Sequence, residues 1–119
     1  MDAMASGGWM VRATALSANV FRFSMYRPGT EPGSGLNRYG FLRADWPPVA
    51  VNEHRSTNGV TLATSAGNLA LGWDAGAATV RLGTAGGAEI FSGRVSPNPR
   101  AGGVVEFGLA EGERFFGLG

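Results

Sequence analysis

The sequence predicts an all-β protein, an antiparallel β-sandwich, and three observations point to this class. Glycine accounts for 20 of the 119 residues, and long helices are disfavoured because each interior glycine costs about 1 kcal/mol relative to alanine. Apolar and polar residues alternate in several short runs, which is the side-chain period of a strand. Turn-forming residues separate these runs at a spacing of about 8–11 residues, typical of a β-meander.

Four runs show the alternation most clearly, each with one apolar face. These faces are Phe21, Phe23 and Met25 in 20–27; Leu69, Leu71 and Trp73 in 69–73; Ala78, Val80 and Leu82 in 78–82; and Val105, Phe107 and Leu109 in 104–109. Polar residues such as Arg22, Thr79, Arg81 and Glu106 occupy the opposite faces. Shorter runs predict further strands at 10–16, 37–42, 49–53, 60–64 and 88–92.

The connecting segments favour tight turns. Asn58-Gly59 is the strongest hairpin signal, because both residue types tolerate a positive φ, and residues 65–68, 74–76 and 84–87 carry similar signals. Strands joined by tight turns must pair antiparallel, since a parallel pair needs a long crossover. A sheet with one apolar face must bury that face, so we expect it to pack on a second sheet.

The domain organisation follows from length and loops. Residues 1–119 are expected to form a single domain, because one core is typical near 100–150 residues. Two stretches rich in proline and glycine, residues 27–35 and 94–103, are predicted to be exposed loops between strands. Neither flank of these loops could bury a core alone, so they are not read as domain linkers.

Composition excludes several kinds of chemistry. The chain has no cysteine, which removes disulfides, thiolate zinc sites and cysteine nucleophiles. All ten basic residues are arginine, so a Schiff-base lysine and a P-loop lysine are absent. His54 is the single histidine, which removes any two-histidine metal site. No cofactor is expected.

Charge and hydropathy bear on partners and location. The ten arginines are dispersed and nearly balanced by nine acids, so no basic patch for nucleic acid is predicted. No apolar stretch reaches the roughly 18 residues of a membrane-spanning helix. The first residues lack a cationic start and an apolar core typical of a signal peptide. We therefore expect no nucleic-acid or membrane partner and a cytoplasmic location.

The carboxylates and the histidine do not assemble an enzyme by spacing. Asp74, Glu111 and Glu113 fall at turns and Glu106 on a polar strand face, so no pair is fixed across a sugar as a glycosidase requires. His54 is interpreted as a surface residue, and no Gly-x-Ser-x-Gly elbow accompanies it. No catalytic residue is therefore predicted.

Tryptophans are the candidates for contact with a ligand. Trp73 alternates with core residues and is interpreted as packing in the core. Trp46 lies in a break between strands, within Asp45-Trp46-Pro47-Pro48, and Trp9 precedes the first clear strand. Both Trp46 and Trp9 could stack on a sugar ring or pack at an interface.

The C-terminal stretch carries the most distinctive motif. An alternating strand is followed by a turn at 110–112 and a second strand predicted to begin at Glu113. The motif reads Glu113, Arg114, Phe115, Phe116, Gly117, Leu118 and Gly119. It resembles the N-terminal domain of glycoside hydrolase family 31, the α-glucosidase and α-xylosidase family. A proline-containing segment at 44–49 and strands at 60–64, 67–71 and 78–82 follow the same order as in that family.

The resemblance implies a galactose-mutarotase-like β-sandwich that packs on a (β/α)₈ barrel and helps shape its substrate pocket. In the family the barrel supplies both catalytic aspartates of a retaining mechanism, and neither has a counterpart here. The chain is therefore expected to be a non-catalytic accessory domain, a fragment incomplete at its C-terminus. Its partners would be the barrel of the parent chain and carbohydrate.

Three other functions stay open. A stand-alone carbohydrate-binding module would use Trp46 or Trp9 as a platform, whereas a β-sandwich interaction domain would bind no sugar. A mutarotase is disfavoured because that chemistry needs histidine and glutamate around the ring. We also expect an unpaired edge at the last strand, which invites self-association.

Overall fold

The computed structural model describes residues 2–4, 8–30, 39–74, 76–97 and 104–114, and in these residues every regular element is a β-strand. The strands form two antiparallel sheets. The three-stranded sheet contains β1 (Asp2–Met4), β2 (Met10–Ser17) and β3 (Val20–Tyr26). The six-stranded sheet contains β4 (Asn52–Ser56), β5 (Gly59–Ala63), β6 (Gly67–Asp74), β7 (Ala77–Thr84), β8 (Glu89–Ser96) and β9 (Val104–Phe107).

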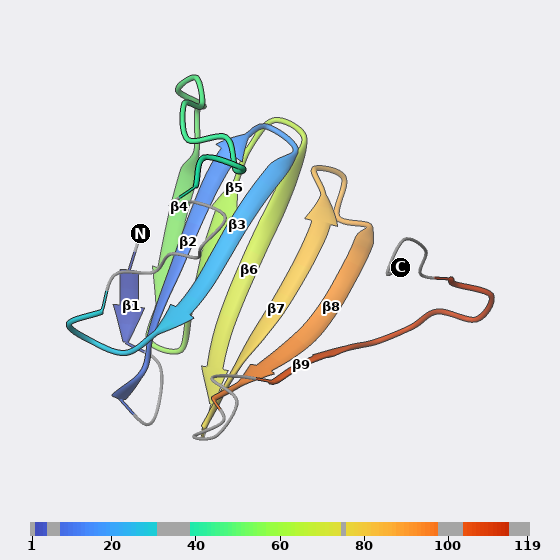
Figure 1. Ribbon diagram of the computed structural model, residues 1–119. Coiled ribbons are helices and arrows are strands. Elements are labelled where there is room, and N and C mark those ends of the chain that lie inside the picture. Colours follow the sequence, from blue (N-terminus) through green and yellow to red (C-terminus); the bar gives the residue numbers. More distant parts are fainter. Residues whose placement is uncertain (1, 5–7, 31–38, 75, 98–103, 115–119) are drawn as a thin grey trace.

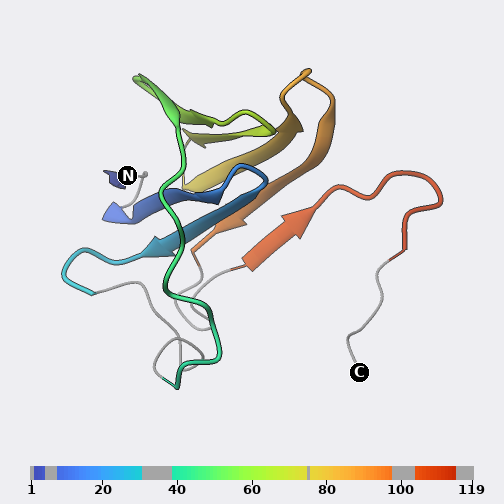
Figure 2. The ribbon, with the colours of Figure 1, turned by 90° about the horizontal axis from the view of Figure 1, so that it is seen from above.

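The two sheets pack face to face, which confirms the predicted antiparallel sandwich. Strand order follows chain order in both sheets, so each sheet is a meander of hairpins. The six-stranded sheet is strongly curved, and β2 and β3 lie on its concave side (Figures 1 and 2). The curvature lets a small sheet cover the middle of a wider one, while β4 and β9 form the two ends.

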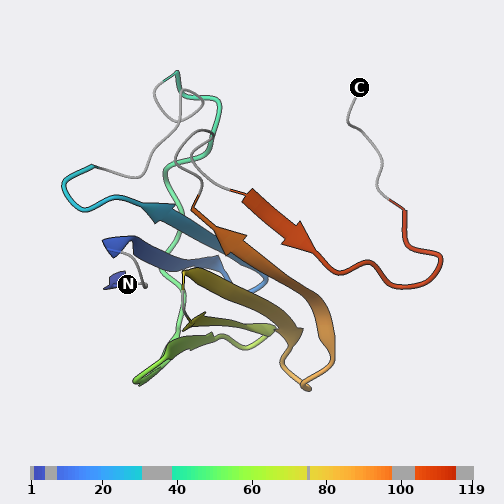
Figure 3. The same cartoon turned by 90° about the horizontal axis from the view of Figure 1, so that it is seen from below.

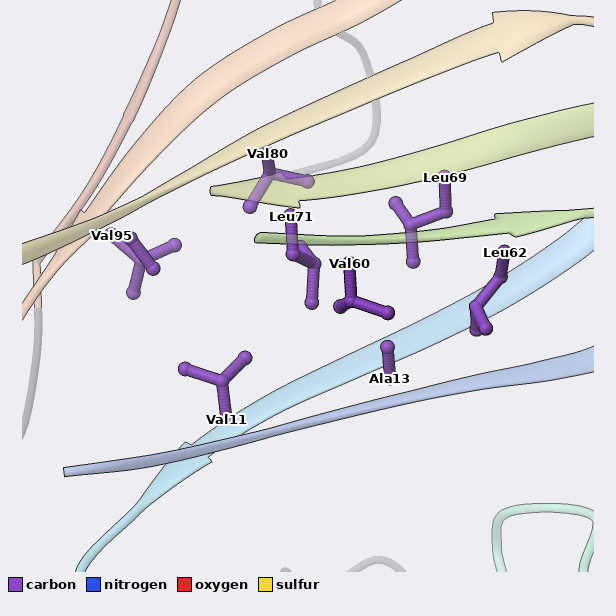
Figure 4. Close-up of a cluster of buried hydrophobic side chains, with 9 residues drawn as sticks. Val11, Ala13, Val60, Leu62, Leu69, Leu71, Val80 and Val95 are labelled. Atoms are coloured by element: carbon purple, nitrogen blue, oxygen red, sulfur yellow. The ribbon is translucent and has the colours of Figure 1, made fainter. Parts of the chain in front are cut away.

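The core lies between β2 and the middle of the six-stranded sheet. Val11 and Ala13 of β2 face the apolar side chains of β5, β6, β7 and β8 (Figure 4). The buried cluster consists of Val11, Ala13, Val60, Leu62, Leu69, Leu71, Ala78, Val80 and Val95. Its members are aliphatic and mostly small, which suits two sheets that approach closely.

Three of the four predicted apolar faces are confirmed. Leu69 and Leu71 are buried in β6, and Ala78 and Val80 are buried in β7. A ring of half-buried residues surrounds this core and packs against it: Trp9, Phe21, Phe23, Met25, Trp73, Leu82 and Phe91. The fourth face, on 104–109, is not buried. Val105 is 47% exposed, Phe107 49% and Leu109 61%, because β2 and β3 do not extend across β9.

A hydroxyl group joins the two sheets at one end. The Thr64 side chain, in the turn after β5, donates a hydrogen bond to the carbonyl of Ala18, in the turn between β2 and β3. The same oxygen accepts the backbone N–H groups of Ala66 and Gly67, at 3.3 and 3.2 Å. Thr64 therefore closes its own turn and fixes that turn against the facing sheet.

The turns confirm the hairpins and correct one detail of their chemistry. Ser56 pairs with Gly59, so Thr57 and Asn58 form a two-residue loop between β4 and β5. Among the described residues no residue other than glycine has a positive φ, and Gly59 does not have one either. The hairpin predicted at Asn58-Gly59 is therefore confirmed, but neither residue adopts the positive φ that both tolerate. Gly76 and Gly87, with φ of 96° and 91°, do adopt a positive φ, in the turns between β6 and β7 and between β7 and β8.

Several strand boundaries differ from the sequence prediction, most of them by one or two residues. Residues 39–42 of the predicted strand 37–42 are not a strand, and Tyr39 and Phe41 are exposed; residues 37 and 38 lie outside the described residues. The strand predicted at 49–53 runs from Asn52 to Ser56, because pairing with β5 fixes its position. Residues 94–96 belong to β8, with Val95 buried between β7 and β9, although the prolines after them favoured a loop. The short β1 had no sequence signal.

We predict that Leu71→Ala destabilises the protein by about 2–5 kcal/mol, because it leaves a cavity in the buried cluster. Leu71 is 3% exposed. The matched control is Thr79→Ala on the outer face of the adjacent strand, which should cost at most about 1 kcal/mol. Urea unfolding followed by circular dichroism measures both. Equal losses for the two variants would contradict the assignment of the core face.

We further predict that Gly93→Ala loosens β9. A Cβ atom at Gly93 would lie 2.8 Å from the Glu106 carbonyl oxygen and 2.9 Å from Cδ1 of Phe107. The Phe107 ring, which contacts Phe91 edge-on at a centroid distance of 4.8 Å, would have to move. Amide hydrogen exchange in β9 should accelerate at least tenfold. Gly86→Ala is the control, since its nearest neighbour would be 3.8 Å away, and it should leave β9 exchange unchanged.

Candidate functional site

The outer face of the six-stranded sheet carries polar residues from several strands. Residues directly opposite each other in a sheet share a face, so the pairing register defines two rows across the strands. The first row is His54, Thr61, Ala70, Arg81 and Ser92, and the second is Ser56, Gly59, Gly72, Thr79, Arg94 and Glu106. We call these residues together the outer-face rows.

The outer-face rows surround two shallow hollows. One lies over β4 to β7 and has a volume of about 240 Å³. The other lies over β7 to β9 and has a volume of about 410 Å³. Thr79 and Arg81 line both hollows, so the two are adjacent on one surface.

The floor of the first hollow is backbone, because two glycines face each other across β5 and β6. A Cβ atom at Gly59 would lie 2.6 Å from the Leu71 carbonyl oxygen. A Cβ atom at Gly72 would lie 2.7 Å from Oγ1 of Thr79. A side chain at either glycine would therefore collide with its neighbours and fill the hollow.

The charges on this face are compensated within the chain. Nε of Arg81 lies 3.4 Å from Oε2 of Glu89, and both side chains are largely exposed. Arg94 lies directly opposite Glu106 in the sheet register. The surface therefore offers hydrogen-bond donors and acceptors without a net positive field, which suits neutral polar ligands better than polyanions.

Trp46 lies in a compact local arrangement in the segment 39–51, which crosses one end of the sandwich to reach β4 (Figure 2). Its indole Nε1 donates to the Arg43 carbonyl at 3.1 Å, and the Arg43 guanidinium lies 4.7 Å from the ring centroid. Nε of Arg43 also donates to the Asp45 carbonyl at 2.8 Å. One face of the half-buried indole is therefore covered by a cation, and its N–H group is already used.

Trp9 lies at the margin of the core. It is half-buried against the cluster, and the Arg27 guanidinium lies 5.2 Å from its ring centroid. Trp9 precedes β2, whereas Trp46 lies between β3 and β4, and neither tryptophan lines the two hollows of the outer face. Trp73, at the end of β6, also packs against the core.

The predicted turn before the C-terminal motif is confirmed. The Glu113 N–H donates to the Ala110 carbonyl at 3.1 Å, and Gly112 has a φ of 80°, as position i+2 of a type II turn requires. Oε2 of Glu113 accepts the Ala110 N–H at 2.8 Å. Glu113 and Arg114 are exposed and are not part of a strand, so the strand predicted to begin at Glu113 does not begin there, because Glu113 is held in the turn. Residues 115–119 of the motif lie outside the described residues.

His54 and the acidic residues Glu106 and Glu111 are exposed. His54 lies on β4, Glu53 pairs with Arg55 at 2.7 Å, and Glu106 lies on the outer face of β9. Within the part of the chain that the structure describes, no three histidine or acidic residues gather as metal ligands. No described helix is long and apolar enough to cross a membrane.

Comparison with known proteins gave no match to a family model, a curated protein or a solved structure.

Sequence reasoning did not identify the outer-face rows as a surface. The alternation predicts Thr79 and Arg81 on one polar strand face, but the sequence pattern favours a loop at Arg94 and a surface position for His54. The signal that brings these residues together is the strand register, which depends on pairings between strands and is not visible in any one run of residues.

Proposed function

We propose that this chain is a non-catalytic accessory domain of a retaining α-glycosidase related to glycoside hydrolase family 31. One feature supports the proposal: near the C-terminal end a strand is followed by a turn with an acidic residue and a glycine, and then by Glu113-Arg114. The turn at 110–113 holds Glu113 through two hydrogen bonds, one to its backbone N–H and one to its carboxylate. That geometry is compatible with the turn that the family motif requires.

The proposed role is structural. An antiparallel sandwich of the galactose-mutarotase-like type would pack on a (β/α)₈ barrel, cover part of it and help shape the substrate pocket. Both reacting carboxylates would belong to the barrel. The distribution of acids in the described residues is consistent with this division, since Glu53 is engaged with Arg55 and Glu89 with Arg81. Carbohydrate would meet the domain at the pocket's margin.

Two measurements test this proposal: the nucleotide sequence of the gene after the codon for Gly119, and an assay of glycoside hydrolysis. We expect the reading frame to continue beyond Gly119 into a barrel-sized region that supplies two catalytic aspartates. We expect the longer polypeptide to hydrolyse an aryl α-glucoside and the 119-residue chain to show no turnover above buffer. Turnover by the 119-residue chain, or an unrelated continuation of the reading frame, would contradict the proposal.

A stand-alone carbohydrate-binding module is the second candidate. The observation that favours it is the hollow over β4 to β7, where Thr61, Thr79 and Arg81 offer hydroxyl and guanidinium groups above a glycine floor. Sugar hydroxyls bind such groups without a change in net charge.

Calorimetric titration with millimolar malto-oligosaccharides tests this second candidate. If the module function holds, heat should be measurable for the native chain and should be lost in Gly72→Leu, which fills the hollow. Trp46→Ala is the paired variant, because it removes the alternative platform and leaves the outer face intact. Absence of heat for the native chain would exclude the module, and loss only in Trp46→Ala would assign binding to the indole.

A further inference from the structure

The two ends of the six-stranded sheet differ in chemistry. At the first end, Glu53 and Arg55 of β4 lie opposite Leu62 and Val60, so these charges share the core-facing side of the sheet. They form an ion pair with a distance of 2.7 Å between Nε and Oε1. Inward-facing charges on an edge strand discourage pairing with another strand. The β4 edge is therefore protected.

The second end, β9, carries apolar side chains in the same position. Val105 lies opposite the buried Val95 and Phe107 lies opposite Gly93, so both side chains are on the core-facing side. About half of the surface of each of these two residues is nevertheless exposed. In Figures 2 and 3, β9 lies at the far end of the curved sheet from β4, beside β2 and β3 and not beneath them. This apolar surface lacks the charges that protect β4.

The backbone of β9 is also available on its outer side. The Gly108 N–H donates to the Ser92 carbonyl at 3.2 Å, toward β8. Backbone groups alternate in direction along an antiparallel strand, so the N–H and C=O groups of Glu106 also point toward β8. The N–H and C=O groups of Val105 and Phe107 therefore point to the free edge. Among the described residues no strand lies beyond β9. The free edge of β9 thus offers two backbone hydrogen-bond donors and two backbone acceptors.

We propose that two copies of this chain pair antiparallel along β9 and form one continuous sheet. In the register that uses all four outward groups, Val105 pairs with Phe107 of the second copy and Phe107 with Val105 of the second copy. Two-fold symmetry about an axis perpendicular to the sheet keeps the apolar faces of both copies on one side. Each Val105 and Phe107 then gains an apolar neighbour across the interface.

Self-complementarity is the reason for assigning a second copy and not an unrelated strand. The four outward backbone groups of one copy bond to the same four groups of the other copy. Val105 and Phe107 of one copy lie beside Phe107 and Val105 of the other. The axis passes beside Glu106, which places the two Glu106 carboxylates opposite one another on the outer face. Arg94 flanks each of them on β8 and offsets their repulsion. This inference does not depend on the proposed glycosidase function.

Cysteine cross-linking tests both the association and the register, because the native chain has no cysteine. Glu106→Cys places two thiols at a non-hydrogen-bonded pair, where Cα atoms are about 4.5 Å apart, within the range of a disulfide. Mild oxidation should therefore give a covalent dimer. Val104→Cys is the control on the same face, because its two copies would be about 14 Å apart, four strand positions at about 3.4 Å each. Equal cross-linking of both variants would overturn the register.

Sedimentation over a concentration series tests the association without cross-links. The native chain should pass from monomer to dimer as concentration rises. Val105→Pro removes an N–H group that points to the free edge and not to β8, so the dissociation constant should rise at least tenfold while the circular dichroism spectrum and thermal midpoint change little. His54→Lys, on the protected edge, should leave the dissociation constant unchanged. A native monomer at every concentration, including one whose β9 edge is occupied by another segment of its own chain, would overturn the proposal.

Discussion

The structure depends on the removal of one face of each sheet from water. Strand side chains alternate in direction, so a run of apolar residues at every second position makes one face of the sheet apolar. Full burial of one aliphatic side chain contributes about 1.5–3 kcal/mol, and the clustered residues from β2, β5, β6, β7 and β8 are all at most 6% exposed. None of the buried side chains in the described residues is polar or charged. The packing of β2 against the curved sheet therefore determines which face of every other strand meets solvent.

The outer face and the two sheet ends follow from that arrangement. Once Leu69, Leu71 and Val80 point inward, their neighbours must point outward, and the register assembles those neighbours into the two polar rows. The three-stranded sheet covers the middle of the six-stranded sheet and leaves both ends uncovered. At β4 the uncovered inner positions are charged, whereas at β9 they are apolar. The surface available for a polar ligand and the surface available for another strand are therefore on different parts of the molecule.

Strong alternation made most strands predictable from sequence. In β3, β6 and β7 a single face carries the apolar residues, so strand identity and orientation could both be inferred. The position of β4 could not be inferred, because Glu53 and Arg55 interrupt the alternation and only pairing with β5 fixes the strand. Val95 was missed because the prolines that follow it favour a loop, although its neighbours in β7 and β9 hold it in the sheet.

The candidate site was less predictable than the fold. Tryptophans are visible in a sequence, so Trp9 and Trp46 stood out, yet arginine side chains lie over both rings. The rows that contain His54, Thr79 and Arg81 depend on which residues lie opposite each other across several strands. That information comes from long-range pairing, and local patterns do not contain it.

Methyl–methyl nuclear Overhauser contacts would examine the packing of the two sheets without any mutation. Face-to-face packing requires cross-peaks between the methyl groups of Val11, on β2, and those of valine and leucine residues in the cluster contributed by the six-stranded sheet (Figure 4). Their absence, with Val11 contacting only its own sheet, would show that the two sheets do not form a sandwich.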